Sequence, residues 1–387
     1  MITKNQLRGE DVRRMTADIV QDHLGLAVVG YKCSTAMVVN VLMKAAVEGV
    51  SVESICRDLR GTTGSNTIRE QLKRVLDVCN LRQDETAMNA ALVACVPRAL
   101  PRTGCAMAID YHDEPFYGKT PELRSYASRG QAEAGTTHFY RIASLYVMWR
   151  HVRVTLAVSY VLLEDTAARV VQRLVERMQH LAFRPGVVYL DKGFSTEGVI
   201  ACLQAHHVPA IIACTIRGED GKGGTRALCR GRSAYTTTYT FKAGTTVRMA
   251  LYPSHPPDKT GRRRRKWLAY VVLGLDWSAH KVHHRYRRRF GIESSYRQLG
   301  HLRVPTTSRN PALRFFLLGL ALLLLNVWVA LRVFATRLPG SGPLRLDLDR
   351  FRLDRFIGFL RRAIEHAYGT LDSIPISSSP SSQFVIY

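Results

Sequence analysis

The chain has 387 residues, of which 46% are hydrophobic, a length that suits two or three packed domains or subdomains. Lys and Arg number 55 against 31 Asp and Glu, so the formal net charge is +24. Such an excess of positive charge is typical of proteins that bind a polyanion: nucleic acid is the first partner to expect, and an anionic membrane surface the second.

The eight cysteines form no Cys-x-x-Cys pair, which argues against a zinc ribbon or a dense disulfide framework and favours a reducing cytosol. The N-terminal stretch has no apolar signal core, so we do not expect secretion.

Residues 1–95 are expected to be all-helical, because apolar positions recur at helical spacing. A Ser begins each of two segments, "STAMVVNVLMKAAVEG" and "SVESICRDL", and Ser is a preferred helix N-cap. The turn "RGTTGS" leads into "NTIREQLKRVLDVC", and two short helices joined by a Gly-bearing turn resemble a helix-turn-helix. We therefore expect a DNA-binding region in which Arg69 and Lys73 contact DNA. A plain helical bundle shows the same pattern and is the alternative.

Residues 96–216 alternate between strand-like and helix-like segments. Three β-rich runs, "GCAMAIDYHD", "THFYRIASLYVMW" and "VRVTLAVSYVLL", come first. The amphipathic helix "EDTAARVVQRLVERMQHL", the short strand "GVVYLDKGF", the helix "STEGVIACLQAHH" and the strand "VPAIIACT" follow. Three meandering strands followed by strands that alternate with helices predict an α/β fold, a mixed sheet covered by helices. This is the order of elements in the ribonuclease H-like fold.

Residues 217–277 interrupt that order and predict a β-rich insertion. A Gly-rich loop precedes three strand-like runs, "AYTTTYTF", "TTVRMALYP" and "KWLAYVVLGLD". The basic run "KTGRRRRK" lies between the last two and includes Arg263 and Arg264, which we expect to hold a phosphate backbone. A solvated loop is the ordinary explanation of such a run.

Residues 278–336 are expected to complete the α/β unit. The stretch "RYRRRFGIESSYRQ" lacks Pro and has apolar and aromatic residues at three- and four-residue steps, which predicts a helix. Residues three, four and seven apart share a helix face, so Tyr286, Arg289 and Arg297 should lie beside Glu293. Taken alone, the stretch is also explained by a solvated helix with an i,i+4 ion pair.

The apolar stretch "FFLLGLALLLLNVWVALRV", residues 315–333, is long enough to span a bilayer and has Arg on both sides. Because Asn326 interrupts it and nothing else in the chain resembles a membrane protein, we expect a buried core helix, with a membrane span as the alternative. Residues 337–387 contain a basic amphipathic helix, "RFRLDRFIGFLRRAIEHAYG", and a Ser/Pro tail that we expect to be disordered.

Two acids follow apolar strands: Asp110 closes the first expected strand and Asp191 closes the fourth. In the predicted sheet these strands are parallel neighbours, so both acids should emerge at one edge, and the helix of Glu293 should lie against it. Three converging carboxylates repel one another unless cations lie between them, which is the arrangement of a two-metal site for phosphoryl transfer. Two further acids of "DYHDE", Asp113 and Glu114, are alternatives to Asp110. His112 shares the face of Asp110 along the strand and is expected to support it.

The segments "AIDYHD", "YLDKGF" and "YRRRFGIESSYR" resemble the three acidic motifs of DDE transposases from prokaryotic insertion sequences. The nearest branch is the IS-four type, which has a β-strand insertion before the Glu. Its signature is Tyr, two residues, Arg, three residues, Glu, six residues, Lys, and Tyr286, Arg289 and Glu293 match it in spacing. Gly300 stands at the place of the Lys, with His301 and Arg303 close by. The resemblance covers about residues 104–305.

The resemblance implies a ribonuclease H-like transposase that cuts DNA at transposon ends and transfers the strand into target DNA. It implies that Asp110, Asp191 and Glu293 bind two Mg²⁺ or Mn²⁺ ions, and that Tyr286 and Arg289 contact the terminal phosphate. Its partner would be double-stranded DNA and its assembly a homodimer. We expect a cytoplasmic, nucleoid-associated protein with no membrane contact and no partner protein.

The resemblance also allows a DNA hairpin intermediate, for which Trp267 and Trp277 are candidate base-holding residues, although core packing is the commoner role for Trp in β-rich segments. Three other classes of protein stay open. A nuclease of the same fold would cut without joining, a transcription regulator would need none of the three acids, and a membrane protein would use residues 315–333.

Overall fold

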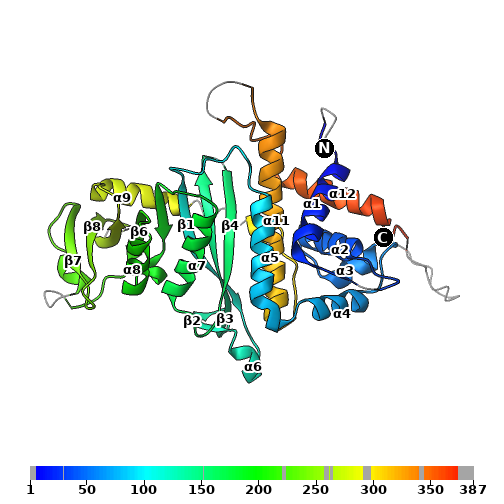
Figure 1. The fold of residues 1–387 in the computed structure, drawn as a ribbon, viewed down its shortest axis with the longest axis horizontal. Helices are drawn as coiled ribbons and strands as arrows, with labels where there is room; N and C mark the ends of the chain where they lie inside the picture. The colour runs from blue at the N-terminus through cyan, green and yellow to red at the C-terminus, as the bar shows by residue number, and fades with distance from the viewer. Residues whose placement is uncertain are drawn as a thin grey trace.

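The structure is a computed structural model that describes residues 6–28, 30–150, 152–219, 224–256, 261, 265–290, 298–339 and 344–373. The expected Ser/Pro tail lies outside these ranges. In Figure 1, α5 and α11 stand side by side in the middle of the molecule, with the other N-terminal helices on one side and the sheet on the other. The chain is therefore of mixed α/β class.

The N-terminal region is built from helices whose starts follow ordinary capping chemistry. The hydroxyl of Ser34 accepts a hydrogen bond from the N–H of Met37, and that of Ser51 accepts one from the N–H of Ser54, as their sequences predicted. The helices are α1 (Gly9–Leu24), α2 (Thr35–Glu48), α3 (Val52–Asp58), α4 (Ser65–Val75), the 3₁₀ turn η1 (Val78–Asn80) and α5 (Leu81–Ala94). The axes of α2 and α3 meet at 107°.

Over the described residues, nine strands form one mixed sheet in the order β2-β3-β1-β5-β6-β9-β8-β7, with β4 also paired to β3. The strands are β1 (Ala106–Pro115), β2 (Ser128–Glu133), β3 (Thr136–Trp149), β4 (Val152–Val161), β5 (Val187–Leu190), β6 (Ala210–Cys214), β7 (Tyr235–Thr240), β8 (Thr246–Ser254) and β9 (Lys266–Leu273). The pairs β1–β5 and β5–β6 are parallel, and the other pairs are antiparallel. Strands β7 to β9 continue the sheet beyond β6.

Helices cover both faces of the sheet, and the alternation of β1 shows which covers which. Met107 and Ile109 join the main core, to which α7 (Ala167–His180) and α8 (Glu197–Ala205) contribute. Ala108 points to the other face, where it packs with Tyr189 of β5 and with α9 (Ala279–Tyr286). Short elements connect these: α6 (Pro121–Arg124) and the 3₁₀ turns η2 (Lys192–Phe194), η3 (Thr225–Leu228) and η4 (Arg287–Phe290).

Side chains from two helices form hydrogen bonds with backbone N–H and C=O groups on the outer edge of β4. The amide of Asn89 on α5 bonds both the N–H and the C=O of Val158, at 2.7 and 2.9 Å. Asn326 on α11 (Pro311–Thr336) does the same for Thr155, at 3.0 and 2.7 Å. An uncovered strand edge carries unpaired backbone groups, so these two helices close the sheet on that side.

Helix α11 has the length and hydropathy of a membrane span, yet 83% of its most apolar stretch is buried inside the structure. It packs on β4 and α5, and Asn326 is 1% exposed. A polar side chain that is both buried and fully hydrogen-bonded fits the expected core helix.

The C-terminal helix α12 (Leu353–Tyr368) returns to the first part of the chain, where it packs on α1 and α2. Lys44 of α2 is buried at this junction, and its Nζ lies 2.6 Å from Glu48, 3.0 Å from Asp58 and 3.0 Å from Glu365. Burial alone would lower the pKa of Lys44, but the hydrogen bonds to these three carboxylates outweigh it, so the pKa is raised. The ion cluster joins α2, the end of α3 and α12.

One local expectation was wrong. Asp110 does not close its strand, because β1 stays paired to β3 as far as Pro115. What ends near Asp110 is the pairing with β5, whose last partners are Ile109 and Leu190. Of the helix expected over residues 285–298, the structure describes the end of α9 at Tyr286, the tighter 3₁₀ turn η4 and helical residues from 298 on, while residues 291–297 lie outside the described ranges.

Candidate active site

Asp110 and Asp191 occupy the point where β1 and β5 part. Each directly follows a residue of the last parallel pair, Ile109 and Leu190, so the two acids are neighbours across the strands, as the order of elements predicted. Asp191 is the N-cap of η2, and its Oδ1 accepts a hydrogen bond of 2.8 Å from the N–H of Gly193. This local bond fixes the Asp191 side chain at the end of β5.

Arg289 lies against both carboxylates. Its Nη2 is 3.0 Å from Oδ1 of Asp110 and 4.0 Å from Oδ2 of Asp191. The Asp110 side chain is 14% exposed and that of Asp191 is 32% exposed, so the first acid is the more deeply enclosed. Burial raises the pKa of Asp110, Arg289 acts to lower it, and the nearby Asp191 charge raises it further, with a net upward shift. The pair therefore consists of one enclosed and one more open carboxylate that share a single arginine.

Tyr286 anchors the helix that brings Arg289 to the site. Its ring is 5% exposed and packs edge-on against Tyr189, while its hydroxyl donates a hydrogen bond of 3.0 Å to the carbonyl of Leu190. The bond joins α9 to β5 one residue before Asp191. The family resemblance implies a phosphate contact for Tyr286, and the described side chain faces the interior. Its spacing from Arg289 in the sequence does not indicate this inward direction.

Four predicted site residues lie outside the described residues: Glu293, Arg297, Arg263 and Arg264. Within the described ranges, no group of three or more His, Cys, Asp and Glu side chains is arranged to hold a metal ion. Two carboxylates side by side are nevertheless the hard oxygen donors that Mg²⁺ and Mn²⁺ prefer, and Arg289 sets a single positive charge against them. The donor set of Asp110 and Asp191 thus fits a divalent cation, with Glu293 as the predicted third ligand.

The two alternative acids of β1 are committed to other arginines. Asp113 forms a bidentate ion pair with Arg141 of β3, at 2.7 and 2.6 Å. Glu114, whose side chain is 5% exposed, forms an ion pair with Arg303 and lies 3.5 Å from Arg314 of α11. These pairs leave Asp110 as the acid of β1 that faces Asp191.

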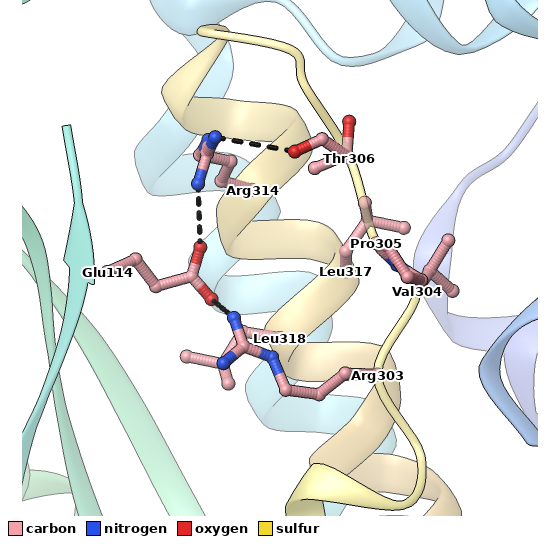
Figure 2. Close-up of a pocket in the computed structure, with 8 residues that line it drawn as sticks. All are labelled: Glu114, Arg303, Val304, Pro305, Thr306, Arg314, Leu317 and Leu318. Atoms are coloured by element: carbon pink, nitrogen blue, oxygen red, sulfur yellow. Dashed lines mark hydrogen bonds and ion pairs between the residues drawn. The ribbon is translucent and has the colours of Figure 1, made fainter. Parts of the chain in front are cut away.

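Glu114 lines a pocket of about 330 Å³ beside α11. Figure 2 shows its carboxylate between Arg314 and Arg303, with Thr306 beyond Arg314. Burial would raise the pKa of Glu114, but His112, Arg303 and Arg314 together lower it, so the group is held ionised. His112 Nε2 is 3.8 Å from Glu114, which places it beside this acid. Because Arg303 belongs to the segment that follows Glu293 in the chain, the cluster ties that segment to the strand of Asp110.

The remaining predicted contacts lie elsewhere. Arg69 and Lys73 are exposed on α4, where Lys73 pairs with Glu70 at 2.7 Å. Trp267 packs edge-on against Tyr235 within the sheet, as a core residue would. Trp277 lies under Lys281, whose Nζ is 4.8 Å from the ring centre.

Comparison with protein families matches residues 151–327 to a family described as the transposase DDE domain. No curated protein matches the chain. Domains of the matched family act on DNA in transposition and generally use divalent metal ions. The matched segment includes Asp191 and Arg289 but begins after Asp110, so the sheet register, rather than the match, brings Asp110 into the site.

Proposed function

We propose that the chain is a DDE transposase that cuts DNA at transposon ends and joins the freed end to target DNA. The observation that carries the proposal is the meeting of Asp110 and Asp191 where two parallel strands part, the second of these acids lying inside the family match. The strand order β4-β3-β1-β5-β6, three antiparallel strands followed by two parallel ones, supports a ribonuclease H-like core. The strands β7 to β9, which lie between β6 and α9, fit the β-rich insertion of the IS-four branch.

In this proposal Asp110, Asp191 and Glu293 hold two Mg²⁺ or Mn²⁺ ions. Such ions activate a water or hydroxyl nucleophile and stabilise the leaving oxygen in phosphoryl transfer. The protein supplies the geometry: the register of β1 and β5 fixes the two Asp carboxylates, and the hydrogen bond from Tyr286 to Leu190 fixes the helix beside them. The guanidinium of Arg289, which lies against both carboxylates, is positioned to turn to a DNA phosphate, and Arg297 is a further phosphate contact.

The wider assembly follows from the chemistry. Two transposon ends have to be joined in one complex, so we propose a homodimer bound to double-stranded DNA. The exposed Arg69 and Lys73 on α4 are the proposed DNA contacts of the helical region. Arg263 and Arg264 add phosphate contacts, and the protein acts in the cytoplasm at the nucleoid.

The test is cleavage and strand joining with Mg²⁺ on a duplex that carries the sequences flanking the element, comparing wild type with Glu293→Gln and Asp191→Asn. We expect both variants to lose both steps while still retarding the DNA in a gel. Asp113→Asn is the matched control, because this acid lies on the strand of Asp110 but is paired with Arg141. Cleavage that persists in Glu293→Gln would show that the three-acid assignment is wrong.

The same assay separates two other functions. A nuclease of this fold would cut the duplex and never join it. A transcription regulator would bind the duplex, show no cleavage in the wild type, and keep all its function in Asp191→Asn.

A further inference from the structure

A second feature lies on the same face of the sheet as the two acids: a groove of about 670 Å³ between the starts of β1 and β5, the turn after β3, and α9. Four cationic side chains line it and, among the described residues that line it, none is acidic. They are Arg150, Arg153, Lys281 and Arg285. A cleft whose lining carries one sign of charge concentrates ligands of the opposite sign, so the occupant to expect is a polyanion.

Aromatic side chains hold two of these cations in place. Lys281 Nζ lies 4.8 Å from the ring centre of Trp277, and the Arg150 guanidinium lies 5.3 Å from that of Trp149. Arg150 also donates a hydrogen bond of 2.7 Å to the carbonyl of Leu344. Positive groups fixed in this way lose little side-chain entropy when they meet an anion.

The groove runs toward the carboxylates along both strands. Val187 and Tyr189 of β5 line it, and side chains alternate along a strand, so Asp191 lies on the same face, about 7 Å beyond Tyr189. Ala106 of β1 also lines it, and Asp110 lies four residues further on the same face, about 13 Å away. A DNA strand rises about 3.4 Å per nucleotide, so these separations correspond to about two to four nucleotides.

We propose that this groove binds the backbone of a DNA strand about two to four nucleotides from the phosphate held at Asp110 and Asp191. The inference rests on the proposed function and adds to it a location for the DNA beside the reacting phosphate. Lys281 and Arg285 are one helical turn apart on α9, so both face the groove, and the same helix leads to Arg289. One element would thus hold several phosphates of one strand.

The test measures how affinity for a duplex depends on salt. Each phosphate contact contributes about 0.9 to the slope of log affinity against log salt, and at 0.15 M salt the loss of two contacts lowers affinity by about thirty-fold. We expect the double variant Lys281→Gln, Arg285→Gln to show a slope smaller by about two and this loss of affinity, with an unchanged thermal midpoint. Arg169→Gln is the matched control, because Arg169 is exposed on α7, which covers the opposite face of the sheet; its slope should not change.

A slope in the double variant equal to that of wild type would overturn the proposal, as would an equal fall in the Arg169→Gln control. Ethylation of phosphates two to four nucleotides from the cleavage position should block binding by wild type, and an absence of such interference would also refute it. Binding is measured without divalent metal, so it does not depend on catalysis. A wild type that never cleaves would therefore refute the proposed function while leaving the salt test of the groove intact.

Discussion

Replacing Asn326 by Leu tests whether α11 is a core helix that closes the sheet. Asn326 Oδ1 accepts from the N–H of Thr155 at 3.0 Å, and its Nδ2 donates to the carbonyls of Thr155 at 2.7 Å and of Leu92 at 3.2 Å. Leu has nearly the same size but can form none of these bonds. The substitution would leave the N–H and C=O of Thr155 without this partner at the edge of a buried strand.

The magnitude follows from those two backbone groups. An unsatisfied buried donor or acceptor costs about 1–3 kcal/mol, so two of them cost about 2–6 kcal/mol. The added apolar surface of Leu returns about 1–2 kcal/mol. We therefore expect Asn326→Leu to lower the free energy of unfolding by about 3 kcal/mol, a large share of the 5–15 kcal/mol typical of a folded domain.

Urea unfolding followed by circular dichroism is the assay. The matched control is Leu331→Met, a volume-conserving change at another buried position of α11, which should cost less than about 1.5 kcal/mol. If α11 instead faced lipid, Asn326→Leu would favour insertion, and the variant would be as stable as wild type or more so. That outcome, especially with the protein in the membrane fraction, would refute the edge-closing role of Asn326.

Three further predictions concern buried charges. Burial, with Asp77 nearby, raises the pKa of Asp84 to about 6. Because the folded state then binds the proton more tightly than the unfolded state, the free energy of unfolding falls as pH rises from about 4 to 6. In urea titrations, Asp84→Asn should therefore be about 1 kcal/mol more stable than wild type at pH 7, after allowance for solvent screening, and equally stable near pH 4. Lys44→Met leaves three carboxylates facing one another and should cost about 2 kcal/mol in urea unfolding at pH 7, less than a fully buried pair because the acids are partly exposed. A free energy of unfolding equal to that of wild type would contradict this. Glu114→Gln leaves Arg303 and Arg314 without their counter-charge, so we expect the free energy of unfolding, measured by thermal unfolding, to fall by about 2 kcal/mol and cleavage to slow. Unchanged cleavage would show that the cluster does not position the segment after Glu293.

The sequence predicted every described strand except β2, because hydrophobic periodicity is a local signal and the short, mostly exposed β2 carries little of it. Placing Asp110 and Asp191 side by side needed only the rule that neighbouring parallel strands present their ends at one edge. The register confirms this adjacency, with Ile109 opposite Leu190. The capping of α2 and α3 by Ser34 and Ser51 was likewise predictable, since an N-cap depends on three or four consecutive residues.

What the sequence missed depends on contacts between distant segments. The Asn326 side chain bonds a strand 171 residues away, and Tyr286 donates to a carbonyl 96 residues away. Nothing in the local pattern distinguishes an inward Tyr from one that contacts DNA, and nothing indicates that β1 continues past Asp110, because its continuation is fixed by pairing with β3. Side-chain direction and strand length were therefore decided by tertiary packing.

The arrangement of charge on one face of the sheet explains how so basic a protein keeps an acidic site. The starts of β1 and β5 lie beside four cationic side chains, whereas Asp110 and Asp191 lie at the far end of the same strand pair, with Arg289 against them. A DNA strand is drawn to the basic groove and repelled by the acids, so it comes close to them only when positive charge lies between phosphate and carboxylate. Arg289 supplies one such charge, which is one fewer than the two carboxylates carry when both are ionised. Divalent cations supply the rest in the proposed function, so the groove would bind DNA without metal, whereas the approach of a phosphate to Asp110 and Asp191 would require it.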